Sequence, residues 1–235
     1  MSFLAMVSCA QMTAGGAPRG DPERGKAIVV GAPGLAPEQA CISCHGIDGQ
    51  GDPAAAFPRL AAQSQDYLLR ALEDYADGRR VHDIMTPVAK ALSSGQRQDV
   101  TAFYASRRDT AWIRPPLEKP ELLQYGAALA AIGSATLGIQ GCINCHGPAG
   151  KGLPPTAPYL SGQPASYIAA RLVAWRGANK ADDATPANIM ARLAGRMGER
   201  EIAAVSEYYA QIAPDPIPAS TISAAGQPLN QEPTP

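Results

Sequence analysis

The sequence predicts an all-α protein built from two copies of one small helical domain. Three observations predict this fold class. The pentad Cys-x-x-Cys-His occurs twice, at residues 41–45 and 142–146. The segments that follow each pentad repeat the same apolar landmarks in the same order. Apolar residues recur at helical spacings of three and four, whereas no segment alternates convincingly with the period of two expected for a strand.

The repeat is visible when the chain is aligned with itself. A shift of 101 residues places "CISCHG" from Cys41 on "CINCHG" from Cys142. A shift of 100 aligns "FPRLAAQSQDYLLRAL" from Phe57 with "APYLSGQPASYIAARL" from Ala157, and a shift of 105 aligns "IMTPVAKAL" with "IMARLAGRM". Because the landmarks keep one order, we interpret the chain as a tandem duplication.

Each copy is expected to form a first, a middle and a last helix. In the first copy the first helix covers 23–30, the middle helix begins at Asp66 and the last helix follows Ser93. In the second copy the first helix covers 121–132, the middle helix begins at Ser166 and the last helix follows Gly198. The first helices open with acidic residues, as the helix dipole prefers. Asp66 and Ser166 are the expected N-caps of the middle helices.

Composition marks the boundaries of the copies. Prolines in "RPPLEKP" favour an extended, semi-rigid spacer, and the end of the chain lacks apolar periodicity. The expected organisation is a leader or lipoprotein-like N-terminus over 1–20, a first domain over 21–110, a linker over 111–120, a second domain over 121–213 and a disordered proline-rich tail over 214–235.

The beginning of the chain leaves alternatives open. "MSFLAMVSCA" has a short apolar stretch but lacks the positive region of a normal signal peptide. "MVSC" resembles a bacterial lipobox, which would make Cys9 a lipid attachment site. The other interpretations are a cleaved or disordered leader, or a structural or catalytic role for Cys9. No apolar run reaches the roughly 18 residues of a membrane span, and a net charge of −1 without a basic patch indicates no nucleic-acid partner.

The pentads are typical of covalent haem attachment. Two cysteines at i and i+3 lie on one side of a helical turn, where they can form thioethers to two vinyl groups, and the following histidine projects its imidazole at the iron. The sequence therefore predicts two haem c groups, attached at Cys41 and Cys44 and at Cys142 and Cys145, with His45 and His146 as iron ligands.

Other chemistry fits the pentads less well. A single zinc ion could take the four cysteines, but both halves of a duplication would then share one site and the histidines would have no role. A redox Cys-x-x-Cys motif is expected in a βαβ context, which this sequence lacks. Structural disulfides would also leave the histidines unexplained.

Each iron then needs a second axial ligand or an open position. Only His82 is left among the three histidines, so both copies cannot use a second histidine. Met85 and Met190 stand at equivalent positions in the repeat, and a thioether ligand raises the reduction potential by favouring Fe(II). Met197 is the competing candidate in the second copy, although it aligns with Leu92. His82 is expected to be an exposed polar residue, with replacement of Met85 as the alternative.

Residues around the pentads are candidates for supporting roles. Pro58 and Pro158 follow each histidine by about a dozen residues, which suggests a nearby carbonyl that accepts the Nδ1–H of the axial histidine. Four arginines either neutralise haem propionates or coat the surface: Arg59, Arg79, Arg80 and Arg176.

At these residues the chain resembles the dihaem cytochromes c of the cytochrome c4 type. The resemblance covers roughly residues 21–213 and is carried by "CISCHG" with "IMTPVAKAL", "CINCHG" with "IMARLAGRM", and the endings "FYA" and "YYA". It implies two tandem class I cytochrome c-like domains, each wrapped round one covalently attached haem. It also implies axial pairs and helix-crossing contacts: His45 with Met85, His146 with Met190, Gly25 with Phe103 or Tyr104, and Gly126 with Tyr208 or Tyr209.

The second copy departs from this pattern. Arg192 replaces Pro87, and an insertion over 181–188 precedes Met190.

We expect an electron carrier, not an enzyme: a dihaem cytochrome that relays single electrons on the periplasmic side by outer-sphere transfer. The expected partners are redox proteins, namely a membrane quinol-oxidising complex, a terminal oxidase or a dehydrogenase, with membrane association through a partner or a lipidated Cys9. One alternative is a haem subunit of a larger dehydrogenase or oxidase complex. The other is a dihaem enzyme with an open haem site, such as a peroxidase or a thiosulfate-oxidising cytochrome.

Overall fold

The computed structural model describes residues 20–177 and 186–214, and over these residues the chain is helical. The first copy contains α1 (Pro22–Val30), α2 (Cys41–His45), α3 (Gln65–Ala76), α4 (Met85–Ala91) and α5 (Ser94–Ser106). The second contains α6 (Pro120–Ile132), α7 (Ile143–His146), α8 (Ala165–Arg176), α9 (Pro186–Ala194) and α10 (Glu199–Ala210). Within the described ranges, β-structure is limited to three isolated bridges. The all-α prediction is confirmed.

The starts of α1 and α5 follow local sequence signals. The carboxylate of Asp21 accepts hydrogen bonds from the backbone N–H groups of Glu23 and Arg24 at the start of α1. Ser93 and Gln96 form a reciprocal capping box at the start of α5, because each side chain accepts from the other's backbone N–H. The expected start of this helix after Ser93 is confirmed.

The expected caps of the middle helices were wrong. α3 begins at Gln65 and α8 at Ala165, so the N-cap positions are Ser64 and Pro164. Both residues have extended backbone, with ψ of 125° and 132°, and neither provides a side-chain cap. Asp66 instead lies inside the first turn of α3, where its charge favours the helix dipole.

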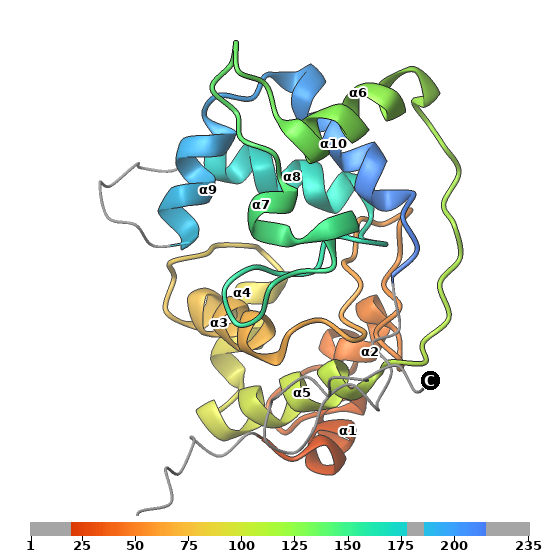
Figure 1. Ribbon diagram of the computed structural model, residues 1–235. Helices are drawn as coiled ribbons and strands as arrows, with labels where there is room; N and C mark the ends of the chain where they lie inside the picture. The colour runs from red at the N-terminus through yellow and green to blue at the C-terminus, as the bar shows by residue number, and fades with distance from the viewer. Residues whose placement is uncertain (1–19, 178–185, 215–235) are drawn as a thin grey trace, which may run out of the picture.

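The first and last helices of each copy cross at a glycine. α1 packs against α5, and α6 packs against α10 (Figure 1). A Cβ atom at Gly25 would lie 2.1 Å from the carbonyl oxygen of Asp99, and one at Gly126 would lie 2.0 Å from that of Ala204. Only glycine allows this approach. The aromatic neighbours at the crossings are Phe103 and Tyr208, members of the expected pairs.

Each copy has its own apolar core. Tyr104 and Tyr209, the second members of the two aromatic pairs, are each 1% exposed and lie inside these cores. The larger buried side chains of these cores are Val29, Leu68, Val100, Phe103 and Tyr104 in the first copy, and Leu129, Ile139, Ile168, Leu172, Met197, Ile202, Val205 and Tyr209 in the second. The described part of the chain contains no helix that is both long and apolar enough to cross a membrane.

The copies stack on each other, and the linker between α5 and α6 runs along one side of both (Figure 1). The guanidinium group of Arg59 donates to the carbonyls of Thr110 and Ala111 at 2.8 and 3.0 Å. Gln211 of the second copy donates to the carbonyl of Pro115 at 3.1 Å. The linker is therefore held by hydrogen bonds to both copies. The expected leader, most of the tail and most of the insertion over 181–188 lie outside the described residues.

Candidate functional site

The pentads form short helical turns that present their donors to a cavity in each copy. α2 carries Cys41, Cys44 and His45, and Cys142 stands at the N-cap of α7. Gly46 and Gly147 end these turns with φ of 74° and 72°, a conformation that glycine adopts without the strain of a Cβ. The four cysteines form no disulfide. Each turn therefore keeps two thiols and one imidazole together.

Both histidines are buried and held by a backbone carbonyl. His45 Nδ1 lies 3.0 Å from the oxygen of Pro58, and His146 Nδ1 lies 3.0 Å from that of Pro158. A carbonyl can only accept, so Nδ1 carries the proton and Nε2 presents a lone pair. Burial lowers the pKa of each imidazole, which keeps it neutral. The carbonyl partners expected from the two prolines are confirmed.

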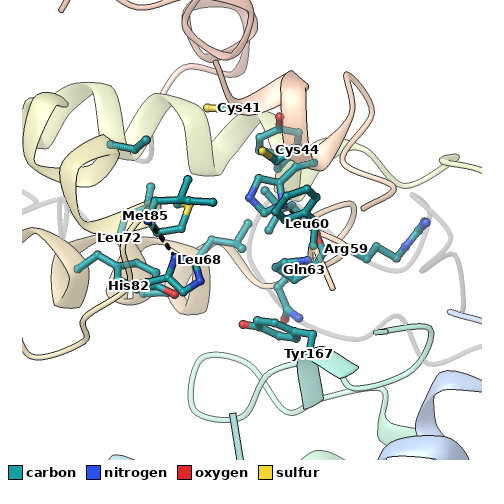
Figure 2. A pocket seen from close by; sticks show the side chains of 18 of the residues that line it. Cys41, Cys44, Arg59, Leu60, Gln63, Leu68, Leu72, His82, Met85 and Tyr167 are labelled. Atoms are coloured by element: carbon teal, nitrogen blue, oxygen red, sulfur yellow. Dashed lines mark hydrogen bonds between the residues drawn. The ribbon is translucent and has the colours of Figure 1, made fainter. Parts of the chain in front are cut away.

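The cavity of the first copy has a volume of about 380 Å³. Figure 2 shows Met85, Leu68 and Leu72 on one side of it, and Cys44 and Leu60 on the other. His45 also lines this cavity, so an imidazole and a thioether border one space. That pairing matches the arrangement expected from the sequence.

Residues of the second copy close one end of the first cavity. Tyr167 of α8 reaches into it (Figure 2), and its hydroxyl accepts a hydrogen bond from Arg80 at 3.2 Å. Arg171 also lines this cavity. Burial raises the pKa of Tyr67, which hydrogen-bonds to Tyr167 and is a neutral phenol. Sequence analysis missed Tyr167 and Arg171 as cavity residues, although Tyr67 and Tyr167 are matched in the repeat.

The cavity of the second copy has equivalent donors but is smaller, at about 70 Å³. Cys142, Cys145 and His146 line it on one side, and Met190 and Met197 both border it.

The surroundings of Met197 favour a core role. Met197 is 4% exposed and packs in the apolar core of the second copy. Leu92, its counterpart in the repeat, is 3% exposed and lines the first cavity in the same way. Met190 is half-buried on α9, as Met85 is on α4.

His82 is exposed and supports the helix that carries Met85. Its Nδ1 accepts hydrogen bonds from the backbone N–H groups of Ile84 and Met85 at 3.2 and 3.4 Å (Figure 2). The ring therefore caps the start of α4, a role that sequence analysis did not identify.

The candidate arginines divide into two groups. Arg59 and Arg80 line the first cavity, whereas Arg79 is exposed and pairs with Asp74 and Asp77 at 2.7 and 2.8 Å. Arg79 therefore belongs to the surface.

Comparisons with known proteins show the family to which the chain belongs. The cytochrome c family model matches residues 23–107 and 130–213, one match in each copy. The chain belongs to the cytochrome c family. It is 37% identical over 174 residues to a thiosulfate dehydrogenase electron acceptor of Stutzerimonas stutzeri, covering 74% of this chain and 79% of that protein.

Solved structures support the same assignment. Reduced recombinant cytochrome c4 from Pseudomonas stutzeri superposes with a TM-score of 0.69 at 29% identity, covering 82% of this chain and 99% of that one. Thiosulfate dehydrogenase (TsdBA) from Marichromatium purpuratum superposes with a TM-score of 0.73 at 31% identity, covering 89% of this chain and 44% of that one. The resemblance to cytochrome c4 is confirmed, and the fold is that of two tandem cytochrome c domains. The chain is a dihaem electron-transfer protein with two covalently bound haem c groups.

The residues of the first cavity suit a haem. The cavity is lined largely by apolar side chains, among them Leu68, Leu72 and Val88, which suit the face of a porphyrin ring. Three arginines on its wall, Arg59, Arg80 and Arg171, have a buried Nε without a hydrogen-bond partner among the described residues. Haem carboxylates would provide the acceptors that these groups lack.

The structure also argues against a zinc site shared by the pentads. Within the described residues, no group of three or more His, Cys, Asp or Glu side chains is placed to hold a metal ion.

Proposed function

We propose that each pentad and one methionine hold one haem. In the first copy Cys41 and Cys44 would form the thioethers, and His45 Nε2 and Met85 Sδ would hold the iron. The corresponding groups of the second copy are Cys142, Cys145, His146 and Met190. The proposal is supported by the two cavities, each of which is bordered by an imidazole with a free Nε2 and by a methionine.

We infer that the protein carries single electrons and performs no substrate chemistry at either haem. The observation that supports this inference is that an imidazole and a methionine line each cavity, so that both axial positions of a haem iron would be filled. The bound haem supplies an iron that changes its oxidation state by one electron. The protein fixes the tautomer of each histidine, surrounds the metal with apolar side chains and neutralises charge through the cavity arginines.

We further propose that the electrons come from a dehydrogenase of the thiosulfate dehydrogenase type and pass to a second redox protein. This assignment is supported by the likeness to a protein named as a thiosulfate dehydrogenase electron acceptor and by the superposition on TsdBA. The proposed location is the periplasm, either free or held at the membrane through a partner or a lipidated Cys9. Cys9 lies outside the described residues.

The first test mixes the oxidised holoprotein anaerobically with a purified thiosulfate dehydrogenase and thiosulfate. Both haems are expected to become reduced, at a rate that rises with dehydrogenase concentration, whereas mixtures without thiosulfate stay oxidised. If dithionite reduces the protein but the dehydrogenase with thiosulfate does not, the proposed donor is wrong. The reduced protein is also expected not to bind CO. CO binding at either haem without denaturant would contradict the closed site.

A further inference from the structure

Two buried glutamines, one from each copy, form hydrogen bonds with the backbone of the other copy. The side-chain amide of Gln163 accepts from the backbone N–H of Arg59 at 3.1 Å and donates to the Arg59 carbonyl at 2.7 Å. The amide of Gln63 accepts from the backbone N–H of Tyr159 at 3.0 Å and donates to the Tyr159 carbonyl at 3.0 Å. Gln63 and Gln163 are 4% and 6% exposed. Each copy thus provides one side-chain amide that hydrogen-bonds to the backbone of the other copy.

The backbone that each glutamine binds also holds the axial histidine of that copy. The carbonyl of Pro58 and the N–H of Arg59 belong to one peptide group. His45 Nδ1–H donates to the oxygen of this group, and its N–H donates to Gln163. A peptide that donates through N–H becomes a better acceptor at its oxygen, a cooperative effect of about 10–30% per bond.

The second copy repeats this chain of hydrogen bonds. His146 Nδ1–H donates to the carbonyl of Pro158, and the N–H of Tyr159 in the same peptide group donates to Gln63. His146, Pro158, Tyr159 and Gln63 are the repeat counterparts of His45, Pro58, Arg59 and Gln163. The histidine of each copy is therefore linked through one peptide group to a side chain of the other copy.

We propose that Gln63 and Gln163 are positioning residues that tune the haem of the opposite copy. Polarisation of the Pro58–Arg59 peptide by Gln163 strengthens the bond to His45 Nδ1–H and increases electron density at Nε2. A more basic imidazole favours the oxidised iron. Gln163 therefore lowers the reduction potential of the first haem, and Gln63 lowers that of the second. The tuning depends on the stacked arrangement of the copies.

The inference rests on the proposed axial roles of the two histidines, and its test separates the two claims. Ring nitrogens that show no iron ligation in the wild-type protein would refute the axial roles before any variant is made. The tuning role is tested by Gln163→Leu and Gln63→Leu, which keep a similar side-chain size and remove the two hydrogen bonds to the opposite copy. Gln63→Leu also removes the bond that Gln63 accepts from the backbone N–H of Ser64 at 3.0 Å within its own copy. Arg70→Ala is the matched control, because Arg70 donates across the same interface to the carbonyl of Pro155 at 2.7 Å without touching a histidine-bound peptide.

The readouts are the Nδ1–H signals in the NMR spectrum of the reduced, ¹⁵N-histidine-labelled holoprotein and the two midpoint potentials. In Gln163→Leu the His45 signal is expected to move upfield and the potential of the first haem to rise, with His146 and the second haem unchanged. Gln63→Leu should give the mirror pattern, and Arg70→Ala should leave both signals in place.

Three outcomes would overturn the proposal: no shift, a shift in the copy that carries the substituted residue, or equal shifts in both copies. If one leucine variant fails to fold, the other tests the proposal alone, since each glutamine binds the histidine-bound peptide of the opposite copy. The wild-type protein provides a measurement that needs no variant. The backbone N–H groups of Arg59 and Tyr159 are expected to exchange slowly with solvent, and exchange at the rate of unprotected amides would contradict the link.

Discussion

Replacing Met85 with alanine is expected to abolish one of two thioether-to-iron bands near the red end of the oxidised spectrum. The potential of that haem should fall by on the order of 100 mV, within the roughly 0.8 V range that axial ligands span, because a thioether favours Fe(II). The reduced variant should also bind CO at one haem, since the methionine no longer fills the sixth position. Visible spectroscopy and an optical redox titration measure both effects.

The second copy supplies the controls for this experiment. Met190→Ala is expected to remove the other band, whereas Met197→Leu should leave both bands unchanged. Leucine already occupies the position equivalent to Met197, at Leu92, where it borders the first cavity. If Met197→Leu removes a band and Met190→Ala does not, the second ligand has been assigned to the wrong methionine. Two bands in Met85→Ala would refute the first assignment.

Replacing Cys41 and Cys44 together with alanine is expected to reduce the haem content from two groups per chain to one. The first domain should also lose its cooperative thermal transition, because a cavity of about 380 Å³ would lack its covalently held group. The second domain has its own core and its own pentad, and should keep its haem. Haem staining on a denaturing gel, pyridine haemochrome and a thermal melt followed by circular dichroism give the three readouts.

Two matched variants make the cysteine experiment specific. Cys142→Ala with Cys145→Ala should leave the first haem in place and remove the second. Cys9→Ser lies outside both pentads and should retain both haems. Retention of two covalent haems after removal of either pair would contradict the proposed attachment, as would loss of both haems from Cys9→Ser.

The internal repeat explains why so much of this protein could be predicted. The repetition of Pro58 as Pro158 pointed to the carbonyl partners of the histidines. The resemblance to cytochrome c4 implied the helix crossings at Gly25 and Gly126. The structure places each pair as expected: a Cβ on either glycine would collide with the facing helix, and each proline carbonyl accepts from a histidine. The order of the helices in each copy was also predicted from the comparison of the two halves of the chain.

The repeat could not predict how the copies face each other. Gln63 and Gln163 were matched landmarks, yet equivalence within the repeat does not show that each would bind the other copy. The same limit applies to Tyr167 and Arg171, which belong to the second copy in sequence but line the cavity of the first. The N-caps of α3 and α8 were misplaced for a local reason, because the helical turn begins before the polar residue that was expected to cap it.

Coulometric titration of the mature holoprotein tests the central claim most directly. A chain that carries two haems with closed axial positions should take up two electrons per polypeptide in two one-electron steps, and the thioether-to-iron bands should disappear in step with them. The uptake should be the same in the presence and absence of CO at low concentration. Uptake of one electron or none per polypeptide would contradict the account of a dihaem electron carrier.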